Sequence, residues 1–400
     1  MKLRIGVFFG GESVEHEVSI ISAQQAIHAL DKNKYEVIPL YIAKDRKIYY
    51  NLEKFFAVES FTNLPALLKE STQVTLVNLG NECVIRPIHT GLFQKKDLGN
   101  IDLAIPVIHG TTGEDGIIQG LFEMLKIPFA GCDIYGSVVG QDKVFQKHIL
   151  HDNHLPITPW FWVYGQDIEN YQTQILEKVN TLGYPVILKP ARTGSSIGIS
   201  VAHNHEDFLE SFKDARRYDE KVIIEKVIKP MREINCSVIG DYTGSKASVL
   251  EEVTQQEKEL LDFDKKYGAG GSKGDSGMAA TSRMVPAPLS NEETKYIQQL
   301  AKDTFRVLDS AGVCRIDFIM DAETKKIYVN EINTIPGSLA FYLWQEEDVD
   351  FTKLMNQLIT LALDRERRRN QLTTSFSSNI LENMAKGGSK GSKGSKTSSR

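Results

Sequence analysis

Two apolar segments near the C-terminus, GVCRIDFIM and KKIYVNEIN, carry polar residues at alternate positions and are joined by the short turn DAETK. Arg315 and Asp317 are two residues apart in the first segment, and Glu331 and Asn333 are two apart in the second. Because side chains alternate across a strand, each pair lies on one face of its strand. We therefore expect a β-hairpin that gathers four polar side chains on one face.

This polar face has two interpretations, a solvent-exposed salt-bridge surface or a buried site in which a cation compensates the carboxylates. The intervening Ile316, Phe318 and Ile332 favour a location in the core, where uncompensated carboxylates are costly. Oxygen ligands from Asp, Glu and Asn suit Mg²⁺ that carries substrate phosphates. We favour the magnesium–nucleotide site and keep the surface salt bridges as the alternative.

The order of apolar runs along the chain indicates a mixed α/β and α+β fold. In the first part, strands alternate with stretches of helical spacing, which is typical of a parallel sheet covered by helices. The expected strands there cover residues 3–9, 35–42 and 101–110. One helix is expected from about Glu17 to Leu30, and a second is expected over residues 120–125. The later part is richer in strands, but residues 290–309 combine a capping-box pattern with a helical apolar face.

Composition and charge exclude several classes of protein. The chain has 400 residues, a formal net charge of -5 and no basic footprint for nucleic acid. Its four cysteines lack the paired spacing of metal sites and lie in apolar surroundings, so we expect reduced core residues. No apolar run is long enough to cross a bilayer, and the expected location is the cytoplasm.

Three shorter motifs carry further candidate residues, each with a simpler alternative. In LKPARTGSSIG, Lys189 and the small turn around Ser195 could hold phosphate oxygens, or the turn could only connect two strands. It is not a P-loop, because no GxxxxGK[ST] pattern occurs. In IIEKVI, Glu225 and Lys226 could line a site or a solvated strand edge, and in GGESVEHEVS, Glu15 could bind a ligand or cap a helix.

The order of these motifs along the chain resembles the D-alanine:D-alanine ligase family from residue 3 to about residue 370. The motifs in register include GGESVEHEVS, HGTTGEDGIIQG, YPVILKPARTGSS, IIEKVI, CRIDF and NEINTIPG. The resemblance implies a three-lobed ATP-grasp fold. We expect an N-terminal α/β substrate lobe (1–131), a central ATP-grasp lobe (132–225), a C-terminal catalytic lobe (226–372) and a flexible basic tail (373–400).

The resemblance also implies a role for each matching residue. ATP would be bound by Lys143, Lys189, Glu225, Lys226, Ile228, Glu233 and Lys266. Two Mg²⁺ ions, with Mn²⁺ as an alternative, would be bound by Asp317, Glu331 and Asn333. The first substrate and the closing loop would be held by Glu15, His109, Ser195 and Tyr267. Arg315 and the backbone N–H of Gly337 would stabilise the tetrahedral oxyanion.

The implied reaction is the ATP-dependent joining of D-alanine to a second amino acid, expected to be D-alanine, through an acyl phosphate. Neither nucleic acid nor membrane insertion is expected, and a homodimer is one expected assembly. The alternatives are a related ATP-grasp peptide ligase with a different amine acceptor and a non-catalytic nucleotide-binding protein.

The sequence departs from the family pattern after NTIPG. It continues SLAFYLW, so that Tyr342 stands where the family has a serine that clasps the carboxylate of the acceptor. A site with fewer polar groups rejects unlike acceptors less strongly. We therefore expect looser selectivity at the second substrate than at the first.

Overall fold

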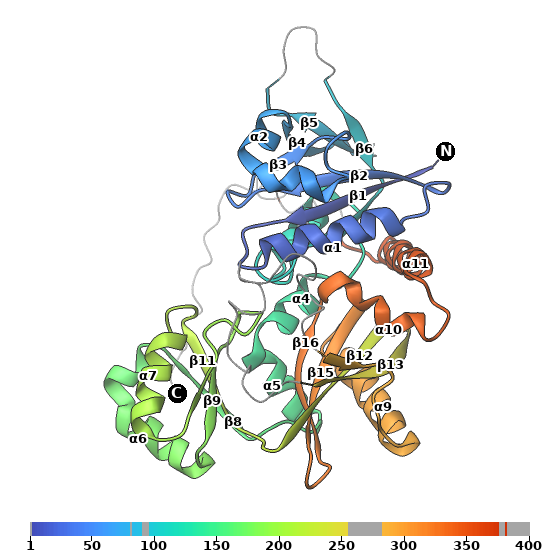
Figure 1. The fold of residues 1–400 in the computed structure, drawn as a ribbon. Coiled ribbons are helices and arrows are strands. Elements are labelled where there is room, and N and C mark those ends of the chain that lie inside the picture. Colours follow the sequence, from blue (N-terminus) through green and yellow to red (C-terminus); the bar gives the residue numbers. More distant parts are fainter. Residues whose placement is uncertain (1, 81, 90–95, 255–281, 376–380, 382–400) are drawn as a thin grey trace, which may run out of the picture. The chain divides into compact units, whose positions relative to one another are not determined.

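The computed structural model describes residues 2–80, 82–89, 96–254, 282–375 and 381 (Figure 1). The described residues up to Leu363 form one compact unit, and the described residues from Asp364 onward belong to a second unit. The first unit contains three β-sheets, of seven, four and five strands. Among the described residues, no helix has both the length and the apolar character needed to cross a membrane.

The seven-stranded sheet, ordered β6-β5-β4-β3-β2-β1-β7, is only partly parallel. β1 pairs in parallel with β2 and β7, as expected, whereas β2 to β6 are joined one after another by antiparallel pairing. Short connections explain the difference for β2–β3 and β4–β5, because parallel pairing needs a longer crossover, whereas β3 and β4 pair antiparallel across η1 and α2. The strands are β1 (Leu3–Gly10), β2 (Tyr35–Ile42), β3 (Ile48–Tyr50), β4 (Thr72–Asn78), β5 (Cys83–Pro87), β6 (Gly99–Ile101) and β7 (Leu103–Val107).

Both faces of this sheet are buried, which explains why β1 is almost continuously apolar. Phe9 packs in one cluster with Ile20 and Ile27, and Phe8 packs in another with Phe122. The helices that follow these strands are α1 (His16–Ala29), η1 (Val58–Asn63), α2 (Leu64–Lys69) and α3 (Ile117–Leu125).

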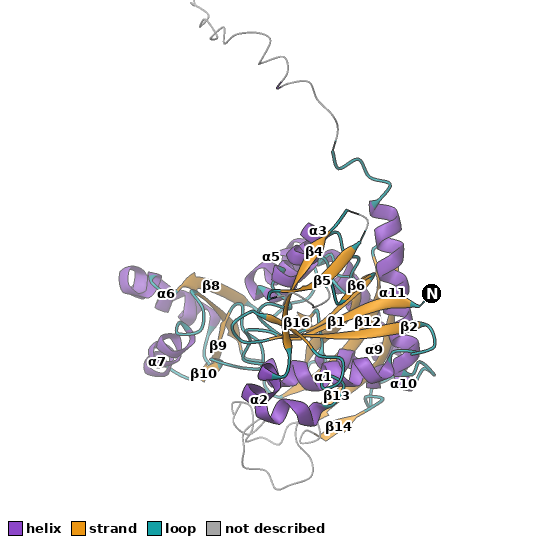
Figure 2. Cartoon of the chain, turned by 90° about the horizontal axis from the view of Figure 1, so that it is seen from above, coloured by secondary structure: helices purple, strands orange, loops and turns teal. Residues whose placement is uncertain are grey.

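The four-stranded sheet, ordered β10-β9-β11-β8, has one apolar face and one face of mixed polar and apolar side chains. Its apolar face packs against α6 and α7, which Figure 2 shows beside these strands. Its opposite face carries Lys189 and Glu225. The elements are α4 (Ile134–Gln141), α5 (Lys143–Asp152), β8 (Trp160–Tyr164), α6 (Asp167–Leu182), β9 (Val186–Pro190), β10 (Ser200–Ala202), α7 (His205–Ala215) and β11 (Lys221–Lys226).

The five-stranded sheet, ordered β14-β13-β12-β15-β16, contains the expected hairpin as β15 and β16. Its apolar face packs against α9, whose capping box between Ser290 and Glu293 forms as expected. The elements are β12 (Met231–Asp241), β13 (Gly244–Thr254), β14 (Ser282–Met284), α9 (Asn291–Val307), β15 (Gly312–Asp321), β16 (Ile327–Asn333), η3 (Gly337–Ala340), α10 (Tyr342–Gln345) and α11 (Phe351–Arg369).

All four cysteines are buried and none of them forms a disulfide, which agrees with their expected place in the core.

Candidate active site

The polar face of the β15–β16 hairpin forms as the alternation predicts. Arg315 lies opposite Asn333, and Asp317 lies opposite Glu331. Arg315 donates to both oxygens of Asp317, at 2.7 and 2.8 Å, and the Asn333 amide donates to Asp317 Oδ2 at 2.9 Å. The side chain of Asp317 is 7% exposed, which rules out the surface salt-bridge alternative.

Asp317 has less compensation than its burial requires. Burial raises the pKa of Asp317, Arg315 opposes that shift, and the neighbouring Glu331 and Glu251 add to it. The net result is a raised pKa, so the environment disfavours the ionised carboxylate. A cation bound beside Asp317 and Glu331 would remove this penalty.

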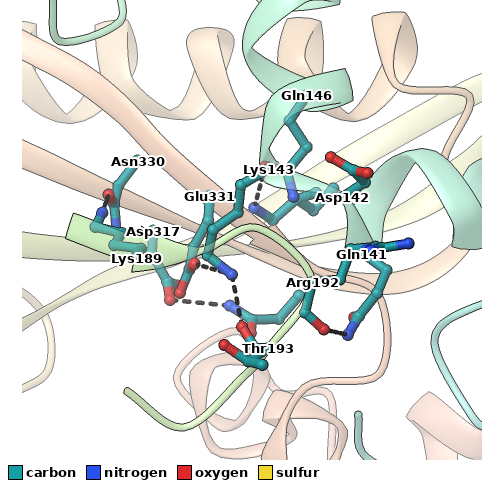
Figure 3. A network of polar contacts seen from close by, with 12 residues as sticks. Gln141, Asp142, Lys143, Gln146, Lys189, Arg192, Thr193, Asp317, Asn330 and Glu331 are labelled. Carbon is teal, nitrogen blue, oxygen red and sulfur yellow. Dashed lines mark hydrogen bonds and ion pairs between the residues drawn. The ribbon is translucent and has the colours of Figure 1, made fainter. Parts of the chain in front are cut away.

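Two lysines from the central part of the chain reach the same place. Lys143, at the start of α5, lies 3.2 Å from Glu331 Oε2 and donates to the carbonyl of Thr193 at 2.8 Å (Figure 3). Lys189, on β9, donates to Asn330 Oδ1 at 3.0 Å. Two ammonium groups thus lie beside the carboxylates, where they can bind the phosphate oxygens of a nucleotide.

Glu225 lies at the centre of a second buried charge cluster. Its carboxylate lies 2.9 Å from Lys147 Nζ and 3.2 Å from Lys189 Nζ, and it accepts from the Thr158 hydroxyl at 2.6 Å. Burial alone would raise the pKa of Glu225, but Lys147, Lys189 and the Thr158 hydrogen bond outweigh it and lower the pKa. β11 lies between β9 and β8, so the alternative of a solvated strand edge is wrong.

The carboxylate of Glu15 meets the two glycine-rich turns of the sequence. It accepts a hydrogen bond from the Ser195 hydroxyl. A Cβ atom at Gly110 or at Gly194 would lie 2.8 Å from Glu15 Oε2, and Gly110 in addition has a positive φ of 72°, which favours glycine. The Glu15 side chain makes no capping hydrogen bond to α1, which contradicts the capping alternative. Helix capping therefore does not occupy the Glu15 carboxylate.

His109 is buried next to this carboxylate, with 3% of its surface exposed. Its Nδ1 lies 2.7 Å from the carbonyl of Ile335, and its Nε2 lies 2.8 Å from the Ser22 hydroxyl. Burial lowers the pKa of His109 even though Glu15 opposes that shift, so the imidazole is neutral at pH 7. A neutral ring held at both nitrogens can orient neighbouring groups.

Two family models match most of the chain. One, described as the D-ala D-ala ligase N-terminus, matches residues 4–132, and the other, described as the D-ala D-ala ligase C-terminus, matches residues 149–360. A D-alanine–D-alanine ligase of Thermosipho melanesiensis is 38% identical over 385 residues, covering 95% of this chain and 98% of the relative. The chain belongs to the D-alanine–D-alanine ligase family.

Solved structures of relatives share this fold. A D-alanine–D-alanine ligase from Coxiella burnetii superposes with a TM-score of 0.75 at 28% identity, covering 92% of this chain and 96% of that one. The VanG D-Ala:D-Ser ligase from Enterococcus faecalis superposes with a TM-score of 0.74 at 26% identity, covering 90% of this chain and 100% of that one. The chain is thus an ATP-dependent ligase with the ATP-grasp fold.

The structure also describes four other expected residues of this ligase. Lys226 donates to the carbonyls of Gly183 and Tyr184, at 2.9 and 3.0 Å. Ile228 follows β11 and is partly buried, Glu233 lies on β12, and Gly337 begins η3, four residues after the end of β16. Lys266 and Tyr267, together with almost all of the glycine-rich segment 267–282, lie outside the described residues.

Two residues that contact the predicted site residues of this ligase were missed in the sequence. Lys147 lies four residues after Lys143 on the same helical face, a spacing that signals its position. Asn330 lies on β16 where the pairing register shifts between Asp317 and Phe318, so strict alternation does not predict its contact with Lys189.

The candidate oxygen donors of this ligase fit a magnesium ion that is bound partly by the protein and partly by the phosphates of a nucleotide. Within the described part of the chain, no three His, Cys, Asp or Glu residues form a metal-binding group. The candidate set has two carboxylates and one amide, from Asp317, Glu331 and Asn333. Mg²⁺ is commonly held by one or two carboxylates, with phosphate and water completing its shell.

Proposed function

We propose that this ligase joins two D-alanine molecules into D-alanyl-D-alanine with consumption of ATP, as a supply for peptidoglycan precursors. The carboxylate of the first D-alanine accepts the γ-phosphoryl group of ATP, and the amine of the second displaces phosphate from the resulting acyl phosphate. The observation that carries this proposal is the meeting of Lys143 and Lys189 with the polar face of the β15–β16 hairpin.

The residues around Glu225 would bind the nucleotide. Lys143 and Lys189 would neutralise phosphate oxygens, and Glu225, Lys226 and Ile228 would line the adenine pocket. Glu233 would bind the ribose, and Lys266 would reach the γ-phosphate. The burial of Glu225 between two lysines supports this arrangement, because it fixes the Lys189 ammonium at the edge of the site.

Asp317, Glu331 and Asn333 would hold two Mg²⁺ ions, or Mn²⁺ in their place. The bound ions would supply neutralisation of the charge that develops on the transferred phosphoryl group. The raised pKa of Asp317 supports this assignment, since a carboxylate short of positive charge gains most from a cation.

The protein itself would orient the two amino acids. Glu15 would bind the first ammonium group, while Ser195 and Tyr267 would fasten the closing loop and His109 would lie beside the carboxylate. Arg315 and the Gly337 N–H would donate to the tetrahedral oxyanion, where one donor contributes roughly 3–4 kcal/mol. Holding amine and acyl phosphate together would contribute ~7–11 kcal/mol more.

A phosphate-release assay tests the proposal. The purified chain is given ATP, Mg²⁺ and a panel of D- and L-amino acids, singly and in pairs, and the products are identified by mass. We expect release that requires D-alanine and yields D-alanyl-D-alanine. Products made only with another amine would support the alternative acceptor, and ATP binding without turnover would support a non-catalytic protein.

Three further features belong to the same proposal. We infer a cytoplasmic location, because the reaction consumes ATP and amino acids. We also infer a homodimer, which light scattering on the purified chain can test. The lobe boundaries at residues 131, 225 and 372 remain predictions, which limited proteolysis can test.

A further inference from the structure

Tyr342 connects the start of α10 to a buried carboxylate on the neighbouring sheet. Its hydroxyl donates to Glu251 Oε1 at 2.7 Å, and the Asn235 amide donates to the same oxygen at 3.1 Å. The Glu251 side chain is only 1% exposed. The segment SLAFYLW suggested an apolar region. Instead, Tyr342 adds a hydrogen-bonded hydroxyl group there.

Arg283, on β14, is the more accessible member of the same cluster. Its Nη1 lies 3.8 Å from Glu251 Oε2, and its side chain is 24% exposed. Its guanidinium carbon lies 5.2 Å from the centroid of the Tyr342 ring. An arginine stacked on an aromatic ring and paired with a buried carboxylate keeps a defined orientation.

This cluster lies on the same face of the sheet as the phosphate site. Glu251, Asn235, Asp317 and Glu331 are paired in one row across β13, β12, β15 and β16. Paired residues share a face, and two strand spacings separate Glu251 from Asp317 by roughly 10 Å.

The order of the strands places the proposed phosphate site and the Glu251 cluster at opposite ends of this sheet face. Glu331, on β16, lies on one side of the β15 residue Arg315, whereas β13 and β14 lie on the other side. A second substrate that approached beside Arg315, on the side away from Glu331, would therefore meet Tyr342 and Arg283.

We propose that Arg283 and Tyr342, oriented by Glu251, bind the carboxylate of the amine substrate and select a free amino acid over its amide or ester. The guanidinium group suits a carboxylate because it offers parallel N–H donors. This inference rests on the proposed ligase function. It replaces the sequence-based expectation of loose acceptor selectivity with a specific clasp.

The test is a competition between two acceptors in one reaction. D-Alanine and D-alaninamide are supplied together with ATP and Mg²⁺, and D-alanyl-D-alanine and D-alanyl-D-alaninamide are quantified by mass. Their ratio does not depend on the fraction of folded enzyme, so it reports selectivity alone. We expect Arg283→Gln to lower the preference for D-alanine roughly 10- to 100-fold, as for a lost hydrogen bond to a charged group.

Three further variants sharpen the test. Arg283→Lys keeps the charge but loses the planar fork, so its preference should lie between those of the wild type and Arg283→Gln. Tyr342→Phe keeps the ring and should lower the preference about 3- to 10-fold. Arg306→Gln makes the same substitution on the exposed surface of α9 and should leave the ratio unchanged.

The outcomes separate this inference from the proposed function. If Arg283→Gln lowers both products by the same factor, or leaves both unchanged, the carboxylate clasp is wrong while the ligase function stands. If the wild-type chain makes neither dipeptide product, the proposed function itself fails.

Discussion

Glu225 and Asp317 are both buried carboxylates on β-strands, yet their surroundings shift their pKa values in opposite directions. Two lysines and a hydroxyl surround Glu225 and lower its pKa. One arginine faces Asp317, and the neighbouring Glu331 and Glu251 help to raise its pKa. The cluster around Glu225 is thus complete without a ligand, whereas the cluster around Asp317 gains from an added cation. The Glu225 cluster holds Lys147 and Lys189 in place, whereas the Asp317 cluster is suited to binding a cation.

The largest expected effect comes from the incomplete cluster. Glu331→Gln removes a charge without changing core volume, so the fold should persist. Phosphate release should fall at least about 100-fold, because metal-assisted charge stabilisation contributes several kcal/mol. Glu323→Gln, in the exposed turn of the same hairpin, serves as the control. A folded Glu331→Gln enzyme with normal phosphate release would refute the metal assignment.

The complete cluster should respond through stability. Lys147→Met leaves the buried Glu225 with one lysine fewer and should lower the free energy of unfolding by about 3 kcal/mol. Adding Glu225→Gln removes the stranded charge and should recover part of that loss. Denaturant unfolding of the single and double variants measures both effects, and a loss below about 1 kcal/mol would contradict the buried-pair argument.

Lys189 belongs to both clusters, because it contacts Glu225 and Asn330. Lys189→Ala should weaken ATP binding about 10-fold, since one charged contact to phosphate contributes roughly 1.5 kcal/mol. Calorimetric titration with ATP measures the change, with Lys213→Ala on the exposed face of α7 as the control. Unchanged affinity would mean that the turn after Lys189 only connects two strands.

The smallest expected effect is in the acid dependence of stability. The pKa of Glu225 is lowered from 4.5, so its contribution is present above about pH 4.5 and is lost as the pH falls below that value. Asp317, with a raised pKa, acts in the opposite direction. Between pH 4.5 and 3, the free energy of unfolding of the Glu225→Gln variant should fall less steeply with pH than that of the wild type, by about 1 kcal/mol per pH unit. Parallel curves for the two proteins would show that Glu225 is not the group responsible.

Local patterns predicted the parts of the site that depend on regular geometry. Alternation on β15 and β16 predicted that Arg315 with Asp317, and Glu331 with Asn333, gather on one face of the hairpin, and the register confirms it. The four antiparallel additions to the N-terminal sheet were missed because short apolar runs do not reveal strand direction.

Contacts between distant segments were beyond these patterns. Glu251 and Tyr342 are 91 residues apart, and only the folded sheet brings them together. Asn330 depends on a bulge that interrupts alternation. By contrast, Lys147 could have been found from its helical spacing to Lys143.

The imidazole of His109 touches a side chain at one nitrogen and the backbone at the other. Its Nε2 depends on the hydroxyl of Ser22, which also accepts from the Ser338 N–H at 3.0 Å. Its Nδ1 needs only the carbonyl of residue 335, which any amino acid supplies. As related genes diverge, Ser22 and His109 should therefore change together or not at all. Position 335 can change among apolar residues without loss of this contact. A recombinant protein that inherits residues 1–131 as one block keeps Ser22 and His109 together.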